Sequence, residues 1–138
     1  MAGIENLAVF NAFAERLSTV ASLPQVQWIN RSVPNEPTLG TVYVRGMVGR
    51  SSEVKMGPGF TVGKGVAYFE VLHSDSDETQ IEAAETLAEA IKAVFPPDDN
   101  LSSDPQVRVM SCYRPTAIID SPWRSEPIAV EYEAYTSR

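Results

Sequence analysis

The stretch DETQIEAAETLAEAIKAVF, residues 77–95, decides the fold, because its apolar side chains repeat at helical spacing and two prolines follow it. The repeating set is Ile81, Ala84, Leu87, Ala88, Ile91 and Phe95. Three glutamates fall on the opposite side, where water solvates them. Asp77, with Gln80 three residues later, fits a capping box at the start of a helix. The pattern predicts an amphipathic helix over residues 77–95.

Outward from this helix, several short segments alternate apolar and polar residues, as strands with one buried face do. The predicted strands span residues 26–29, 41–48, 66–73, 107–113 and 128–134. An opening helix is predicted over residues 4–22, where apolar side chains again recur at helical spacing. The prediction is an α+β fold with a mixed, mainly antiparallel sheet of about five strands. Two helices pack on one face of this sheet, and the element order is αβββαββ.

The connection between the second and third predicted strands, residues 49–65, is longer than a hairpin turn requires and contains several glycines. Long connections of this kind are usually functional or disordered. We therefore expect a long hairpin loop at about 49–65. The chain has 138 residues and 43% hydrophobic content, which suit one globular domain with a core, so residues 1–138 are predicted to form a single domain.

The composition excludes several classes of partner. A formal net charge of −7 argues against a general attraction to nucleic-acid phosphates or anionic membranes. Four basic residues, Arg45, Arg50, Lys55 and Lys64, are close in sequence, but their spread along strands and a loop indicates a solvated face. The single cysteine, Cys112, excludes an intrachain disulfide. No apolar run approaches the roughly 20 residues of a membrane helix. We expect a protein made inside the cell that binds no membrane and no specific nucleic acid.

The sequence has no motif for catalysis or for a cofactor. The glycine-rich stretch does not fit a phosphate-binding loop, because Pro58 and Gly65 replace its glycine and its Ser or Thr, and a strand follows where a helix should. His73, the only histidine, ends a predicted strand beside Asp75 without a recognisable nucleophile. One histidine and one cysteine cannot form a His- or Cys-based metal cluster. The prediction is no catalytic, cofactor-binding or metal-binding residue, and a protein that is not an enzyme.

Nearly the whole chain shows a further pattern, which lies in the order of its predicted elements and in the residues that each of them contains. Its segments are an opening helix at 4–21, VQWIN at 26–30, TVYVR at 41–45, a glycine-bearing hairpin into GVAYFEV at 65–71, IEAAETLAEAI at 81–91, SPWR at 121–124 and IAVEYEAY at 128–135. In the order and the local residue patterns of these segments, the chain resembles the tail terminator proteins of long-tailed bacteriophages, including the broad tail terminator-like group.

The resemblance implies a structural virion protein that assembles as a hexameric ring on the last ring of the tail tube. Such a ring ends tube polymerisation and presents the tail to the head. The implied partners are further copies of the chain, the tail tube protein and the head–tail connector or stopper protein, with DNA passing through the lumen. The implied location is the tail or neck of the virion, after synthesis in the host cytoplasm. No cofactor is implied.

A ring that repeats one contact until it closes needs two different exposed patches on each subunit. We expect these patches in the loop at 50–60 and on the strand faces that bear tyrosines. The residues predicted to contact partners are Arg45, Arg50, Lys55, Met56, Phe60, Tyr43, Tyr68 and Tyr135.

Two other functions fit the same sequence. A head–tail connector or another neck protein would share the size, the acidity and the ring assembly, and contact with the tail tube would distinguish it from a terminator. A small ligand-binding domain or enzyme would use a pocket around His73 and Cys112, although the sequence offers no paired acid and base for it.

Overall fold

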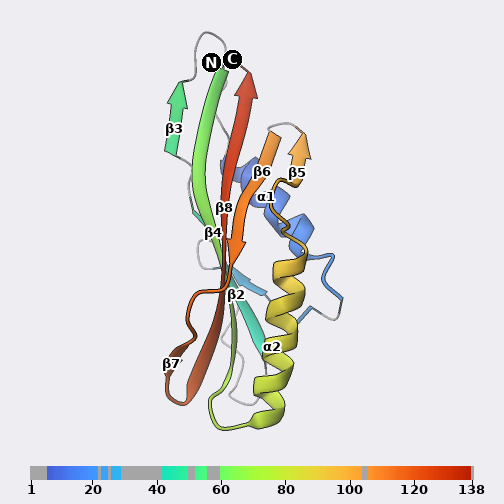
Figure 1. The fold of residues 1–138 in the computed structure, drawn as a ribbon, viewed down its shortest axis with the longest axis vertical. Helices are drawn as coiled ribbons and strands as arrows, with labels where there is room; N and C mark the ends of the chain where they lie inside the picture. Colours follow the sequence, from blue (N-terminus) through green and yellow to red (C-terminus); the bar gives the residue numbers. More distant parts are fainter. Residues whose placement is uncertain are drawn as a thin grey trace.

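In the computed structural model, two long antiparallel strands organise the rest of the chain (Figure 1). They are β4 (Phe60–Ser74) and β8 (Trp123–Ser137), which pair along their whole length. The structure describes residues 6–21, 23–24, 26–28, 42–49, 52–55, 60–103 and 106–137. For residues 6, 52–55, 60–61, 103 and 136–137 it describes the backbone alone.

Six further strands complete the sheet within the described part of the chain. They are β1 (Val26–Trp28), β2 (Tyr43–Val48), β3 (Ser52–Lys55), β5 (Asn100–Ser103), β6 (Gln106–Tyr113) and β7 (Ile118–Asp120). The main path has the order β1-β2-β4-β8-β6-β5, while β3 pairs with β4 and β7 pairs with β8. Only β1 and β2 pair in parallel among these strands. The prediction of a mixed, mainly antiparallel sheet is confirmed.

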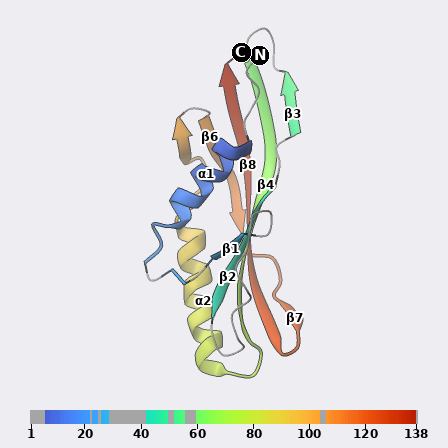
Figure 2. The same cartoon turned by 180° about the vertical axis from the view of Figure 1, so that it is seen from behind.

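Two helices, α1 (Asn6–Leu17) and α2 (Glu78–Ala93), cover one face of this sheet (Figures 1 and 2). Phe13 of α1 contacts Tyr132 of β8, with ring centroids 5.2 Å apart. Phe95, just after α2, stacks on Phe69 of β4 at 5.4 Å. All four rings are buried. The core therefore lies between the helices and this face, and the predicted α+β arrangement is confirmed.

The start of α2 agrees with the predicted cap. The Asp77 carboxylate accepts hydrogen bonds from the backbone N–H groups of Thr79 and Gln80, at 3.0 and 3.3 Å. Gln80 does not complete a capping box, however, because its side-chain oxygen accepts from the backbone N–H of Ser74 at 2.9 Å. The side chain thereby joins the helix start to the end of β4.

The prediction of about five strands is wrong, because eight strands form in the described residues. Three short strands were missed. β5 and β7 bear little alternation, and all three residues of β7 are exposed, so neither gives a clear period-2 signal. β3 lies inside the stretch 49–65 that was predicted to be a loop.

Most of the predicted loop at 49–65 is strand, because β3 spans Ser52–Lys55 and β4 begins at Phe60. At least one glycine of this stretch serves packing rather than a turn. Gly65 pairs with Tyr132, and a Cβ at Gly65 would lie 2.5 Å from the Tyr132 hydroxyl oxygen. Glycine is needed there so that the ring can lie against the backbone.

Candidate functional site

The side of the sheet away from the helices is the candidate site, and we call it the open face. Side chains alternate along a strand, so the residues between the core-facing ones point to this side. The open face includes Tyr43, Arg45, Met47, Val66, Tyr68, Glu70, Tyr113 and Tyr135. No helix of the described residues packs against it (Figures 1 and 2). Three predicted tyrosines and Arg45 thus share one face.

Tyr43 does not offer the exposed surface that was expected of it, because its side chain is 1% exposed. Its ring lies edge-on to Trp123 of β8, with centroids 5.5 Å apart and an interplanar angle of 89°. The sequence could not show this, since the two rings are 80 positions apart in the chain. The Tyr43 side chain therefore lies on the open face but is buried there against the Trp123 ring.

A hollow of about 340 Å³ lies beside this aromatic pair at one end of the open face. Its lining residues are Tyr43, Arg45, Glu70, Leu72, Ile118, Asp120, Trp123 and Ser125. Two predicted contact residues, Tyr43 and Arg45, therefore line the same hollow.

Arg45 and Tyr68 lie around Glu70 of β4. A terminal nitrogen of Arg45 is 3.4 Å from the Glu70 carboxylate, which also accepts a hydrogen bond of 2.8 Å from the Ser125 hydroxyl. The pKa of Tyr68 is raised, first because its hydroxyl is partly buried and second because the Glu70 charge is near. Tyr68 therefore stays neutral and half-buried at the centre of the face.

Tyr135 lies at the other end of the open face. Its hydroxyl donates to the Glu133 carboxylate, and this hydrogen bond is the main reason that its pKa is raised. Glu133 is also 3.7 Å from the ammonium of Lys64. Tyr135 is thus half-buried and bonded within its own subunit.

The remaining predicted contact residues lie in or beside segments that the structure does not describe. Arg50 and Met56 lie outside the described residues. For Lys55 of β3 and Phe60 of β4 only the backbone is described. Their predicted contacts with partners stay predictions.

The open face also exposes apolar side chains that sequence reasoning missed. Met47, Tyr68, Ala129 and Tyr113 lie in one row across four strands, since each pairs with the next. Met47 is 37% exposed and Tyr113 is 47% exposed, and Val66 in the next row is 44% exposed. Alternation of residues 41–48 could have placed Met47 on this face, but Tyr113 comes from a strand distant in sequence. The row creates an apolar surface in the middle of the sheet.

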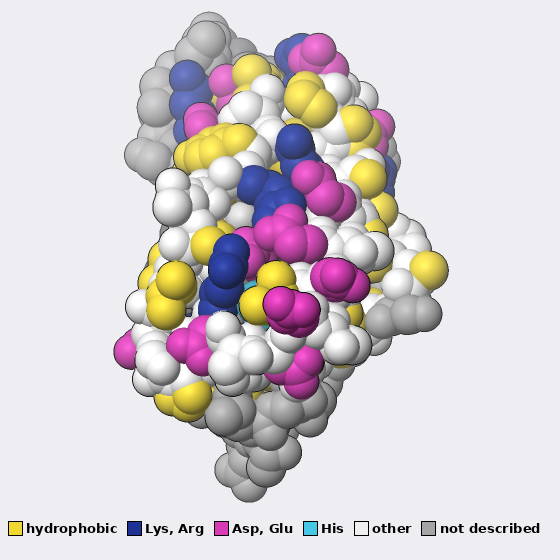
Figure 3. Space-filling model, turned by 60° about the horizontal axis from the view of Figure 1, so that its bottom comes forward, with side chains coloured by type: hydrophobic (Ala, Val, Ile, Leu, Met, Phe, Trp, Pro, Cys, Tyr) yellow, Lys and Arg dark blue, Asp and Glu magenta, His cyan; other side chains and the backbone are white. Residues whose placement is uncertain are grey.

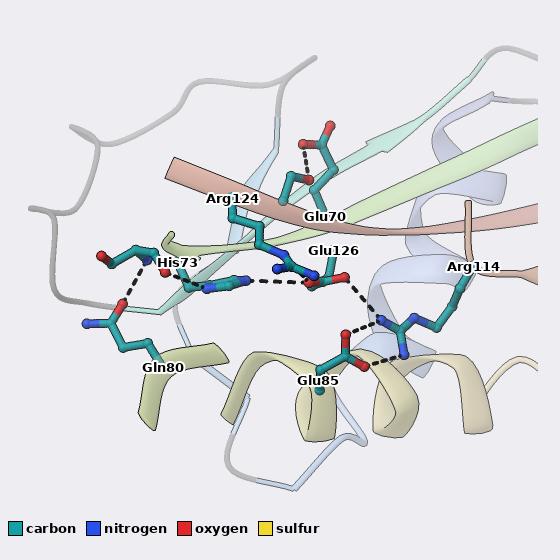
Figure 4. A network of polar contacts seen from close by, with 9 residues as sticks. Glu70, His73, Gln80, Glu85, Arg114, Arg124 and Glu126 are labelled. Atoms are coloured by element: carbon teal, nitrogen blue, oxygen red, sulfur yellow. Dashed lines mark hydrogen bonds and ion pairs between the residues drawn. The ribbon is translucent and has the colours of Figure 1, made fainter. Parts of the chain in front are cut away.

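A polar network lies on the other side of the sheet, between β8 and α2 (Figure 4). The Glu126 carboxylate, 3% exposed, is 2.9 Å from Nε of Arg124 and 3.2 Å from a terminal nitrogen of Arg114. Arg114 also donates two hydrogen bonds to Glu85 of α2, at 2.9 and 3.1 Å. These bonds lower the pKa of Glu85. The network joins the helix to the sheet.

His73 lies at the end of this network, and its side chain is fully buried. Its Nδ1 is 2.9 Å from the carbonyl oxygen of Ser74, and a carbonyl only accepts, so Nδ1 is the donor. Its Nε2 is 3.7 Å from Glu126 and has no hydrogen-bond partner. Buried in this way, His73 has no access to a ligand.

The cleft that Cys112 lines does not include His73. Besides Cys112, the residues that line this cleft of about 280 Å³ are Glu89, Lys92, Ala93, Phe95, Pro96 and Pro97. Burial raises the pKa of the thiol to about 11. A thiol of that pKa is protonated at neutral pH, which disfavours a role as nucleophile.

Charge and metal-binding groups give no further site. Figure 3 shows acidic and basic side chains interleaved on the face that it presents, rather than gathered in a patch of one sign. Among the described residues, no three His, Cys, Asp or Glu side chains come together as a metal site requires. None of the described helices has the length and apolar character to cross a membrane.

Comparison with known proteins establishes the fold alone. No protein-family model matches the chain, and no curated protein matches it. One solved structure, whose name describes no function, has a TM-score of 0.71 and 24% identity, covering 96% of this chain and 96% of that chain. Another, described as "Virion of native gene transfer agent (GTA) particle", has a TM-score of 0.40 and 15% identity, covering 94% of this chain and 92% of that chain. The first TM-score shows a common fold, whereas the second TM-score is too low to establish one.

Proposed function

We propose that this chain is a structural virion protein of the tail terminator kind, which closes into a hexameric ring on the end of a phage tail tube. The ring ends tube polymerisation and provides the tail side of the head–tail joint. The observation that carries the proposal is the open face, where Met47, Val66 and Tyr113 expose an apolar surface that no described part of the subunit covers. Surfaces of this kind mark contacts with other proteins.

The order of elements supports the proposal as well. The structure has an opening helix, strands, the alanine-rich helix α2 and then strands up to residue 137, which is the order in which the sequence resembles tail terminator proteins. The overall charge of −7 suits a ring whose lumen lets DNA slide without sticking. The partners in this proposal are further copies of the chain, the tail tube protein and the head–tail connector or stopper protein.

An enzyme or ligand-binding domain around His73 and Cys112 has less support. His73 is fully buried within a polar network, and Cys112 lines a different cleft. A catalytic role would need an accessible acid, base or nucleophile in one pocket.

The test is to mix the purified protein with tail tubes assembled from the tube protein of the same phage and to image the tubes by negative stain. Light scattering of the protein alone gives its mass before mixing. The expected result is a ring of about six subunits, either in solution or formed on tube ends, and tubes that no longer elongate when more tube protein is added.

Tubes that elongate at the same rate with and without the protein would refute the terminator function. If rings form and bind the connector but not the tube, the protein is a connector or another neck protein. A monomer that binds neither tube nor connector would refute both virion functions. A ligand-binding domain or enzyme would then be the function to test.

A further inference from the structure

The hollow at one end of the open face, which we call the Trp123 hollow, has an acidic group at one end and apolar walls. The acidic group is the carboxylate of Glu70 on β4, whose side chain is 15% exposed. Its walls include Leu72, the Trp123 ring and Ile118 of β7, which is 50% exposed. In register, Leu72 is opposite Ser125 and Ser125 is opposite Ile118, so all three lie on the open face. A ligand in the hollow would contact apolar side chains along its length and a carboxylate at its end.

The Glu70 carboxylate is only partly paired. The Ser125 hydroxyl and a terminal nitrogen of Arg45 both reach the same oxygen, Oε2, at 2.8 and 3.4 Å. A distance of 3.4 Å is long for a charge-assisted hydrogen bond, and Nε of Arg45 has no partner within the described residues. The other oxygen, Oε1, accepts no hydrogen bond from the described part of the chain and is not sealed from solvent. Oε1 can therefore accept from a further donor.

Glu126 of β8 shows what a carboxylate of this protein binds when both of its oxygens are paired (Figure 4). Its Oε1 is 2.9 Å from Nε of Arg124, and its Oε2 is 3.2 Å from a terminal nitrogen of Arg114. Glu70 lies on the opposite side of the sheet, because it is in register with Pro127. It has an arginine on Oε2 alone. A second cation on Oε1 would give Glu70 the same arrangement.

The charges that line the hollow also favour a cation. They are the carboxylates of Glu70 and Asp120 and the guanidinium of Arg45, two negative charges and one positive. Asp120 is exposed and forms no ion pair with a described residue. Asp120 is opposite Trp123 while Glu70 is opposite Pro127, so the two acids lie at opposite ends of the hollow. One acid thus attracts a cation at the rim, and the other bonds it inside.

The walls decide which kind of cation fits. A calcium ion takes about six to eight oxygen ligands, which apolar walls do not supply. Lysine and arginine instead lay an alkyl stem on apolar surface and keep the charged end at a polar group. Leu72 and Ile118 suit the stem, and the Trp123 ring attracts a cation as well. The volume of about 340 Å³ is near the lower limit of roughly 300 Å³ for ligand pockets, which suits one long side chain.

The hollow is continuous with the exposed apolar row of the open face. Glu70 and Tyr68 are two positions apart on β4, and Arg45 and Met47 are two positions apart on β2. A protein that covers the row therefore reaches the hollow too. We infer that the Trp123 hollow binds a lysine or arginine side chain of the protein that docks on the open face. The inference rests on the proposed function and deepens it, because it names the chemistry by which the open face recognises its partner.

The test uses the two tryptophans of the chain as reporters. Trp123 lines the hollow, whereas Trp28 packs against Phe10 and Phe69 on the helix side. Heteronuclear NMR of the nitrogen-labelled protein resolves their indole N–H signals. The probes are N-acetyl-lysine methylamide and N-acetyl-arginine methylamide, and N-acetyl-norleucine methylamide is the uncharged control. Both cationic probes are expected to shift the Trp123 signal in a saturable manner and to leave the Trp28 signal in place.

Glu70→Gln is the decisive variant, because it removes the charge at Oε1 with little change of shape. It should weaken binding of the lysine probe about tenfold, as the loss of a hydrogen bond to a charged group does. The matched control is Glu131→Gln, since Glu131 is exposed on the open face but does not line the hollow, and it should bind as wild type does. Asp120→Asn changes an exposed group at the rim and should weaken binding about twofold. It keeps the test decisive if Glu70→Gln does not fold.

A Trp123 signal that neither cationic probe shifts would overturn the inference. So would an equal shift with the norleucine control or with calcium chloride at the same ionic strength, or wild-type affinity in Glu70→Gln. If the probes bind as expected while tubes elongate freely, the hollow binds basic side chains and the terminator function fails. If the probes do not bind while the protein still caps tubes, the inference is wrong and the proposed function stands.

Discussion

Tyr132 shows at the residue scale how this fold depends on one pair of positions. Its ring lies against Gly65 of β4, and its hydroxyl donates a hydrogen bond of 2.8 Å to the carbonyl oxygen of Gly49. Burial raises its pKa to about 12, so it remains a donor at any physiological pH. The ring also contacts Phe13. With both ends held, the side chain has no freedom to move aside.

Gly65→Ala should therefore lower the free energy of unfolding by about 1–3 kcal/mol, because the added methyl group overlaps the Tyr132 ring. Chemical denaturation measures the change. In a Tyr132→Leu background the same substitution should cost much less, since the overlapping atoms are gone. An equal loss in both backgrounds would show that the ring is not the cause.

At the element scale, Arg114 joins α2 to β8. It binds Glu85 on the helix and Glu126 on the strand, and Glu126 is almost fully buried. A buried carboxylate that loses a cation is destabilising, because water cannot replace the lost partner. Arg114 thus adds a polar link to the apolar packing that holds the helix on the sheet.

Arg114→Ala is expected to lower the free energy of unfolding by up to about 3 kcal/mol, the low end of the range for a broken buried pair, because Arg124 still pairs with Glu126. Denaturant titration gives the value. The matched control is Arg108→Ala, whose partner Asp98 is exposed, and it should cost much less than Arg114→Ala. Similar losses in both variants would contradict the importance of burial.

The same bridge has a pH dependence through Glu85. Arg114 lowers the pKa of Glu85 below its ordinary value of about 4.3. A lowered folded pKa means that the pairing stabilises the protein above the unfolded value and is lost as pH falls through the folded value. Wild type should therefore be more stable than Glu85→Gln at pH 7, and the difference should shrink below about pH 4. A difference that does not change between pH 7 and pH 3, measured by denaturation, would refute this.

At the scale of the whole molecule, the sheet has two unlike faces. Helices bury one face, while the open face exposes Met47, Val66 and Tyr113. A subunit with this asymmetry can contact different partners on different sides. The proposed ring uses that asymmetry, since its tube and head sides must differ.

Tyr113→Glu should abolish or greatly weaken binding to a partner of the open face while leaving stability within about 0.5 kcal/mol, because the side chain is already 47% exposed. Co-sedimentation with tail tubes or the connector measures binding, and denaturation measures stability. Leu7→Glu, at 57% exposed on α1, is the control and should bind as wild type does. Equal binding by both variants would contradict the prediction that the open face contacts a partner.

Within one strand, alternation predicts which side chains share a face, as with Tyr43 and Arg45, because side-chain direction in a strand is a local property. The pairing of β2 with β4 decides that Arg45 and Tyr68 share a face, so alternation alone does not predict it. Alternation could not show that Trp123 covers Tyr43, or that Met47 and Tyr113 share a row, since these contacts join distant segments.

The sequence by itself determined helix α2, its Asp77 cap and the α+β class, because apolar spacing and capping act within a few residues. Only the tertiary structure decided that β3, β5 and β7 pair, because edge strands with little alternation are stabilised by hydrogen bonds to a neighbour. It also decided the network at Glu126, whose partners come from β4, β8 and the segment after β6. The local sequence pattern determines whether a segment forms a helix or a strand. Contacts between residues distant in the sequence determine which face of the sheet stays exposed.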